Sequence, residues 1–228
     1  MSKVIDNMNR CAESFKQKTP SDMDLMIEFH VSNLNQYFDI VVKNQMVSII
    51  DKQDVPKDIV VSASEETIDL ILSGEMEAFT AAGKADMREK APLDWKIGVK
   101  FTPDKMNHIY YFLTHFFTRD KIKVIKLTEC ASRKVHGANA IPLFYHLGMR
   151  SAWYMVKKGE KMNEIGDTNP FDQGIVIVSG QGKGKIGEEM ISLKPNHAYH
   201  IPKNSDHVVW NEEDNPLVLI WFAWGKGA

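Results

Sequence analysis

The sequence predicts an α+β protein of two domains, with a sheet covered by helices over residues 1–120 and an all-β barrel over residues 121–228. Two observations predict this division. In the first part, some segments place apolar residues at helical spacing, while others are short extended runs. From Val124 onward, short apolar runs are separated by Gly, Asn, Asp and Pro without a long helical pattern, which is typical of a barrel or sandwich.

The composition is that of an ordinary globular protein, with 43% hydrophobic and 25% charged residues. The net charge of −2 provides no positive field for a phosphate backbone, so we expect no nucleic-acid partner. Cys11 and Cys130 form no metal or disulfide motif, and we expect reduced, mostly buried thiols. Charged residues stand near the N-terminus where a signal peptide is apolar, and the apolar run 217–224 is shorter than the ~20 residues that span a bilayer. These features predict a cytoplasmic protein without an integral membrane segment.

The first domain is predicted to begin with an amphipathic helix, because apolar residues from Val4 to Phe15 recur at three- and four-residue spacing and Pro20 follows. Four extended runs come next. They favour an antiparallel sheet with one apolar face, and they cover residues 23–31, 37–42, 46–50 and 58–62.

A second helix follows these runs, with Ser62 or Ser64 as its N-cap and Gly74 at its C-terminal end. A shorter helical segment over residues 75–82 ends at Gly83, and residues 95–101 are expected to be extended. Thr102 is predicted to cap a further helix whose apolar face runs from residue 106 to 117.

Residues from about 20 to 100 resemble the sterol carrier protein type 2 family, through the stretch DIVVSASEETIDLILSGEMEAFTAAGKADM. The shared pattern is a strand, a Ser-capped helix ending in Gly74, a short helix ending in Gly83, and a final strand. The resemblance implies a sheet covered by helices around an apolar tunnel that holds lipids or fatty acyl groups. A filled core uses the same residue types as a tunnel, so the sequence leaves both alternatives open.

The second half resembles the cupin superfamily, through GKGKIGEEMISLKPNHAYHIPKNSDHVVWN. Pro202, His207 and Asn211 stand at fixed places of the second cupin motif, and Asn204 replaces its glycine. Because Asn tolerates a left-handed backbone, we expect this turn to be kept. The resemblance implies a jelly-roll barrel, with Gly180 as the last glycine of the first motif.

Most of the metal ligands that the cupin resemblance implies are missing. Gln173 stands where the first motif has Glu, and residues 166–172 contain no histidine, so His207 alone remains. A catalytic metal usually has three or more protein ligands. We therefore expect no cofactor. The alternative is a divalent metal in a rearranged site of His207, Gln173 and Asp167.

The candidate ligand-binding residues lie on predicted barrel strands and have polar tips or aromatic rings. They are His207, Tyr199, His200, Trp210 and Gln173. Strand alternation allows only about half of such residues to face the interior. Among them, His207 is the first choice, because its motif position faces the barrel interior in the family.

Two functions of different classes follow from these features. The first is a binding protein for a lipid-like or other apolar small molecule, with the cupin barrel as a second binding or dimerising module. The alternative is a cupin-type enzyme that acts on an apolar molecule through a rearranged metal or acid–base site around His207. We also expect a homodimer formed through the cupin domain, since the apolar strand 217–224 would need cover.

Overall fold

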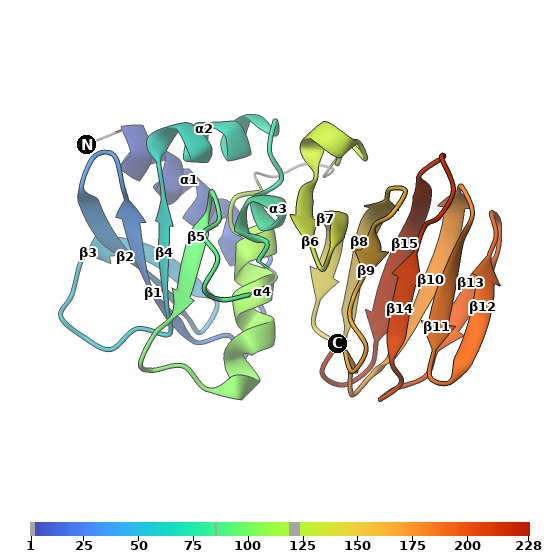
Figure 1. Ribbon diagram of the computed structural model, residues 1–228. Coiled ribbons are helices and arrows are strands. Elements are labelled where there is room, and N and C mark those ends of the chain that lie inside the picture. Colours follow the sequence, from blue (N-terminus) through green and yellow to red (C-terminus); the bar gives the residue numbers. More distant parts are fainter. Residues whose placement is uncertain (1–2, 85, 119–123) are drawn as a thin grey trace. The chain divides into compact units, whose positions relative to one another are not determined.

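The computed structural model describes residues 3–84, 86–118 and 124–228. The chain divides into two compact units, Met1–Val124 and Ile125–Ala228 (Figure 1). The boundary predicted near residue 120 lies outside the described residues. In the part of the chain that the structure describes, no helix has the length and apolar composition that crossing a membrane requires.

The first unit is a five-stranded mixed sheet with helices. The strands lie in the order β3-β2-β1-β4-β5, where β1 and β4 are parallel and the other neighbours are antiparallel. A run of antiparallel strands was predicted, so the parallel pair is a difference, which arises because the chain crosses over before β4. The elements are α1 (Lys3–Lys16), β1 (Leu25–Val31), β2 (Gln36–Lys43), β3 (Met46–Asp51), β4 (Ile59–Ala63), α2 (Glu65–Ser73), α3 (Ala78–Ala82), β5 (Asp94–Ile97), a 3-10 turn (Pro103–Lys105) and α4 (Met106–His115).

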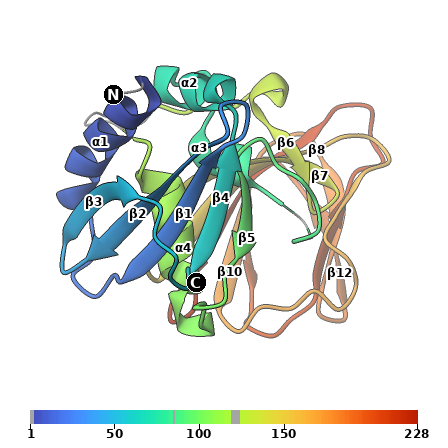
Figure 2. The same ribbon diagram turned by 90° about the vertical axis from the view of Figure 1, so that its left-hand side faces the viewer.

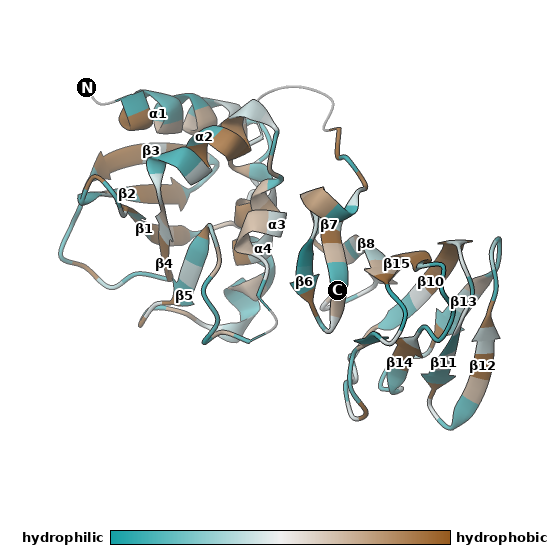
Figure 3. Ribbon diagram, turned by 45° about the horizontal axis from the view of Figure 1, so that its top comes forward, coloured by the Kyte–Doolittle hydropathy of each residue, from teal (hydrophilic) through white to brown (hydrophobic). Residues whose placement is uncertain are grey.

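Helices α1 and α4 cover one face of this sheet (Figures 1 and 2). Hydrophilic and hydrophobic residues are interspersed along α1 (Figure 3), as the spacing predicts, and its apolar side is buried. Phe15 of α1 packs edge-on against Phe112 and Phe116, with ring centroids 5.8 Å apart in both pairs. Phe29 of the sheet stacks on Phe38 at 5.1 Å. Aromatic rings therefore fill this part of the space between sheet and helices, where the sequence left a tunnel or a filled core open.

The segment from β4 to β5 has the element order that the sequence predicts. Ser64 is the cap of α2, because its side chain accepts a hydrogen bond from the backbone N–H of Thr67 at 3.1 Å. Gly74 ends the helix in the left-handed conformation, with φ of 82°. The short helix α3 begins at Ala78, later than predicted, because the Glu77 carboxylate caps it at the Thr80 N–H.

Two boundaries near the end of the first unit differ from the prediction. Strand β5 covers only Asp94–Ile97, and the backbone N–H of Gly98 turns to the carbonyl of Asp58 at 2.8 Å. The Thr102 side chain makes no capping hydrogen bond, and the helical segment opens with a 3-10 turn before α4. The proline in the first turn is where the sequence places it.

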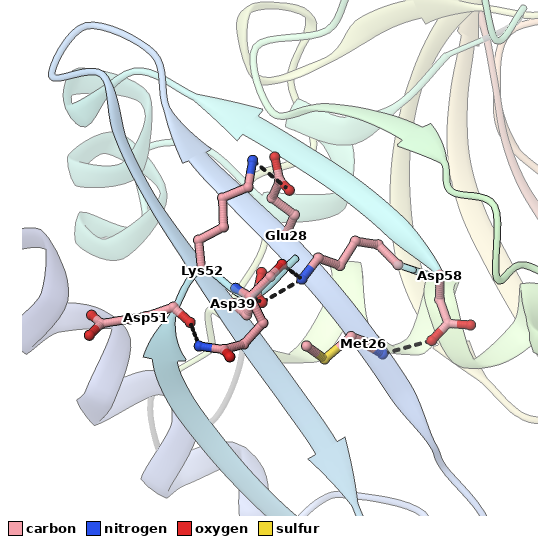
Figure 4. A network of polar contacts seen from close by, with 8 residues as sticks. Met26, Glu28, Asp39, Asp51, Lys52 and Asp58 are labelled. Carbon is pink, nitrogen blue, oxygen red and sulfur yellow. Dashed lines mark hydrogen bonds and ion pairs between the residues drawn. The ribbon is translucent and has the colours of Figure 1, made fainter. Parts of the chain in front are cut away.

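The connection between β3 and β4 is held to the sheet by buried charges (Figure 4). Asp39, which is fully buried, forms an ion pair with Lys57 and accepts a hydrogen bond from the Gln53 backbone N–H at 2.8 Å. Asp58, also fully buried, accepts a hydrogen bond from the Met26 N–H at 2.7 Å. Removing one partner of such a buried pair leaves an uncompensated charge. This network therefore fixes the path of the chain into β4.

The second unit is built from two antiparallel sheets whose inner faces share one core (Figure 1). The all-β architecture predicted for this part of the chain is confirmed. One sheet has the order β13-β10-β15-β8-β7-β6 and the other β12-β11-β14-β9. After a 3-10 turn (Glu129–Ala131), the strands are β6 (Arg133–Val135), β7 (Ala138–His146), β8 (Met149–Val156), β9 (Lys161–Met162), β10 (Asp172–Ser179), β11 (Gly182–Ile186), β12 (Glu189–Leu193), β13 (Ala198–Ile201), β14 (His207–Trp210) and β15 (Leu217–Trp224).

Two turns predicted from the sequence have the expected backbone. Asn204 adopts a left-handed conformation with φ of 60°, which confirms that Asn can serve in place of the glycine. Gly180 has φ of 75°, and a Cβ atom there would lie 2.1 Å from the carbonyl oxygen of Pro216. Only glycine fits at this position without moving the backbone.

Within the described residues neither cysteine forms a disulfide, and the exposure of Cys130 differs from the prediction of mostly buried thiols. Cys11 is buried in the helix α1, whereas Cys130 is exposed in the 3-10 turn before β6. No apolar periodicity surrounds residue 130 in the sequence, so local pattern provides no reason for its burial.

Candidate functional site

Gln173 is the most completely buried polar side chain on the inner face of the barrel, with an exposed fraction of 0%. It lies on β10 in the same row as Ile175 and Ile177, which belong to the core. Its side-chain oxygen accepts two hydrogen bonds, from the indole N–H of Trp221 at 3.0 Å and from the amide of Asn169 at 3.1 Å. These two donors fix which way the amide group points.

The amide nitrogen of Gln173 has no hydrogen-bond partner among the described residues. A buried donor without a partner costs about 1–3 kcal/mol, and native structures contain few of them. The atom can therefore donate to an oxygen acceptor that the described residues do not supply. A carbonyl, carboxylate or hydroxyl oxygen has the required chemistry.

His207 begins β14 in the facing sheet and is 3% exposed. Its Nδ1 lies 3.3 Å from the backbone carbonyl oxygen of Ser205. Because a carbonyl only accepts, Nδ1 carries the hydrogen in this contact, and in the neutral ring the lone pair is on Nε2. The side-chain amide of Asn163 donates to the His207 carbonyl at 3.2 Å and ties the start of the strand to the preceding turn.

Burial lowers the pKa of His207 below its ordinary value of 6.5. The Ser205 carbonyl and the carboxylates of Asp167 and Asp206 oppose this shift only in part, and His136 adds to it. The imidazole is therefore neutral at pH 7, with an unprotonated Nε2 atom that can accept a hydrogen bond.

The donors around His207 do not fit the metal site that the cupin resemblance implies. Among residues 3–84, 86–118 and 124–228, no three His, Cys, Asp or Glu side chains come together as metal ligands. The Gln173 oxygen is already used by two N–H donors. Asp167 is exposed, and its Oδ2 accepts a hydrogen bond from the Glu164 N–H at 2.9 Å, as a turn residue does.

The structure divides the five candidate ligand-binding residues between two faces. Tyr199 packs against the barrel core together with Gln173 and His207, and its hydroxyl donates to the Ser192 carbonyl at 2.9 Å. His200 lies on the opposite face of β13, 3.3 Å from Asp172. Trp210 also faces away from the core, and its indole N–H donates to Glu212 at 3.0 Å. This division agrees with the prediction that strand alternation lets only about half of such residues face the interior.

Two aromatic residues outside those five belong to the inner face. Trp221 contacts Gln173 from β15, and Tyr154 packs on the same core from β8. Burial raises the pKa of Tyr154 to about 12, so its phenol is protonated at pH 7. Both are aromatic residues on strands that the sequence predicts for the barrel, and the alternation of Leu217, Leu219 and Trp221 places this indole on the inner face.

Asn211 stands at a fixed place of the second cupin motif, according to the resemblance. Its side chain makes hydrogen bonds with backbone groups. Its amide nitrogen donates to the carbonyls of Val156 and Asn215 at 3.0 and 2.9 Å, and its oxygen accepts from the Glu213 N–H at 2.8 Å. All these groups are used within the chain. Asn211 therefore stabilises the turn after β14.

Residues 152–223 match the family model of the cupin domain. Solved structures similar to this chain include a cupin 2 conserved barrel domain protein from Salinispora arenicola, with 15% identity over 46% of this chain and 91% of that chain and a TM-score of 0.41. Others are the plu4264 protein from Photorhabdus luminescens (16% identity, 46% and 90%, TM-score 0.42) and the TT1209 protein from Thermus thermophilus (22% identity, 46% and 99%, TM-score 0.40). No curated protein matches the chain.

The C-terminal unit thus contains a cupin domain, and this assignment rests on the family model. The match begins at Ala152 in β8 and ends at Ala223 in β15. It includes both Gln173 and His207. The resemblance of the first unit to sterol carrier proteins lies outside the matched residues and stays a prediction.

Proposed function

We propose that this chain is a small-molecule-binding protein whose cupin barrel holds a largely apolar molecule through a single oxygen atom. The unpartnered amide nitrogen of Gln173 is the observation that supports this proposal. The core residues beside it on both sheets are aliphatic, including Ile175, Leu219 and Val209. A ligand that suits such surroundings has an apolar body and one acceptor for the amide.

The replacement of Glu by Gln at position 173 favours binding over metal chemistry. A carboxylate offers only acceptors and a negative charge, which suit a cation. A glutamine offers two N–H donors and no charge, which suit a ligand oxygen. The neutral His207 would supply the second polar contact, with Nε2 accepting from a ligand hydroxyl.

We place the molecule in the barrel, although the sterol-carrier resemblance favours a lipid in the first unit. The rings of Phe15, Phe112 and Phe116 pack against one another between α1 and α4 of the first unit. A lipid would have to displace these contacts. In the barrel, the buried amide nitrogen of Gln173 has no partner among the described residues.

The test is to identify any small molecule that co-purifies with the full chain. Native mass spectrometry gives the mass of the complex, and solvent extraction then releases the bound molecule for identification. We expect an apolar, oxygen-containing molecule on the wild type. At pH 8.5, Gln173→Glu keeps an acceptor for Trp221 and Asn169 but loses the donor, so occupancy should fall at least about tenfold, the equivalent of ~1.4 kcal/mol. The matched control Gln181→Glu, on the turn before β11, should retain the molecule.

An unoccupied wild type that also fails to bind decanoic acid or decanol in a fluorescence titration would rule out the proposal. Equal occupancy in the wild type and Gln173→Glu would show that the Gln173 amide does not contribute to binding of the molecule. The same extraction tests the enzyme alternative, which the neutral His207 with its unprotonated Nε2 favours. If His207→Gln retains a molecule that differs chemically from the one on the wild type, acid–base catalysis replaces passive binding.

A further inference from the structure

The outer face of the smaller sheet of the second unit carries a groove of about 570 Å³. It lies on the opposite side of the sheet from the barrel core, because its lining residues alternate with the core residues along the strands. Lys185 pairs with Met190 on one neighbouring strand and with Val208 on the other, so these three side chains form one row. Trp210 lies two residues further along β14 on the same face.

The floor and rim of this groove are more apolar than an outer sheet surface needs to be. Val208 is buried on the floor beside the half-buried indole of Trp210. Met190 and Ile165 are 64% and 70% exposed, although both are large and apolar. Apolar side chains gathered in a hollow of this volume are typical of a ligand site.

The charges that line the groove are matched, with the exception of Lys185. Glu160 pairs with Lys134 at 2.6 Å, Lys161 with Glu164 at 2.8 Å, and Glu212 with Lys183 at 2.7 Å. Within the described residues, the carboxylate that pairs with Lys185 is Glu188, which is 3.8 Å away and almost fully exposed. A pair of this length and exposure contributes little. An anion bound in the groove would therefore compete only with this weak pair for the Lys185 ammonium group.

We propose that this groove is a second ligand site, which binds a small amphiphilic anion. The apolar part of the ligand, aromatic or aliphatic, lies on Trp210, Val208 and Met190. Its carboxylate, sulfonate or phosphate pairs with the Lys185 ammonium group. The site is separate from the barrel interior, and it does not depend on the ligand proposed for Gln173.

The test is a titration of the full chain with 8-anilinonaphthalene-1-sulfonate, which joins an aromatic body to an anionic group. We expect saturable binding with an increase in dye fluorescence. Lys185→Gln and Met190→Gln should each weaken it about five- to tenfold. The matched control Lys194→Gln, an exposed lysine outside the groove, should bind as the wild type does. The uncharged N-phenyl-1-naphthylamine should bind the wild type and Lys185→Gln equally.

Three results would overturn the proposal. The first is no saturable dye binding at 1 mM, and the second is equal dye affinity in the wild type and Lys185→Gln. The third is a concentration-dependent dimer, seen by sedimentation velocity, that Met190→Gln abolishes while dye binding is unchanged, since a second copy of the chain would then be the occupant. Unchanged binding in Gln173→Glu would show that the dye does not occupy the barrel site at Gln173, and unchanged melting curves would exclude partial unfolding as the cause of dye binding.

Discussion

The imidazole of His207 is buried, and its surroundings disfavour the charged form of the ring. Burial dominates its electrostatics, although two carboxylates lie close enough to oppose the shift. The turn before β14 supplies a carbonyl for Nδ1, so the ring orientation is set by the backbone of Ser205. The same residue would be a weak metal ligand by itself, because an ion needs further donors that the neighbouring turn does not direct toward it.

The lowered pKa of His207 predicts how the free energy of unfolding depends on pH. The unfolded chain binds a proton at His207 near pH 6.5, whereas the folded chain binds it only at lower pH. The unfolded state therefore holds more protons in this window, and the free energy of unfolding should fall as the pH drops below about 6.5. Above this window the contribution is constant.

Urea unfolding of the wild type and His207→Gln between pH 5 and 8 measures this effect. The difference between the two proteins should change with pH only below about 6.5, and the imidazole proton signal in NMR should titrate below that value. The exposed His197, changed to Gln in the same way, serves as the control. A pKa of His207 above 6.5 would contradict the prediction.

At the scale of the element, helix α2 shows how local signals fix both ends of a short segment. Nine residues form a weak helix by themselves, so the caps and the buried face decide whether it is stable. Ser64 satisfies one backbone N–H at the start, and Glu65 and Glu66 lie in the first turn, where the helix dipole favours negative charge. Ile68 and Ile71 are buried on the inner side.

Ser64→Ala should lower the free energy of unfolding by about 1 kcal/mol, because the Thr67 N–H loses its acceptor. Ser64→Asp should restore most of the loss, since aspartate caps equally well. Ser73→Ala, on the exposed last turn of the same helix, should change stability by less than ~0.5 kcal/mol. Equal losses at positions 64 and 73 in urea unfolding would show that capping is not the cause.

At the scale of the whole molecule, each unit has its own apolar core. The first unit buries an aromatic cluster between its sheet and its helices, and the second buries aliphatic side chains between two sheets. Units with separate cores can unfold in separate steps.

We predict two unfolding transitions that respond to different substitutions. Phe112→Ala removes a fully buried ring and should destabilise the first unit by about 3–5 kcal/mol. Leu219→Ala should destabilise the second unit by about 2–5 kcal/mol. Differential scanning calorimetry should show each variant lowering one transition and leaving the other in place. A single transition shifted by both variants would mean that the units unfold together.

Several features of the fold were predictable from short stretches of sequence. The periodicity from Val4 to Phe15, the cap before α2 and the left-handed turn at Asn204 depend on neighbours a few residues away. The helix boundaries near Glu77 and Thr102 were harder to predict from the sequence. Each boundary depends on which polar side chain accepts a hydrogen bond from a backbone N–H at the start of the helix. The sequence contains more than one such side chain near each boundary.

The candidate site was predictable in part. From the sequence alone, the cupin resemblance predicts that Gln173 and His207 occupy motif positions of a barrel and that three of the usual metal ligands are missing. Folding brings the Gln173 oxygen to the indole of Trp221, 48 residues away in the sequence, and leaves the Gln173 nitrogen without a partner among the described residues. It also separated His200 and Trp210 from the interior. The physical reason is that periodicity and capping are local interactions, whereas the orientation of a buried amide depends on donors that folding brings together from distant strands.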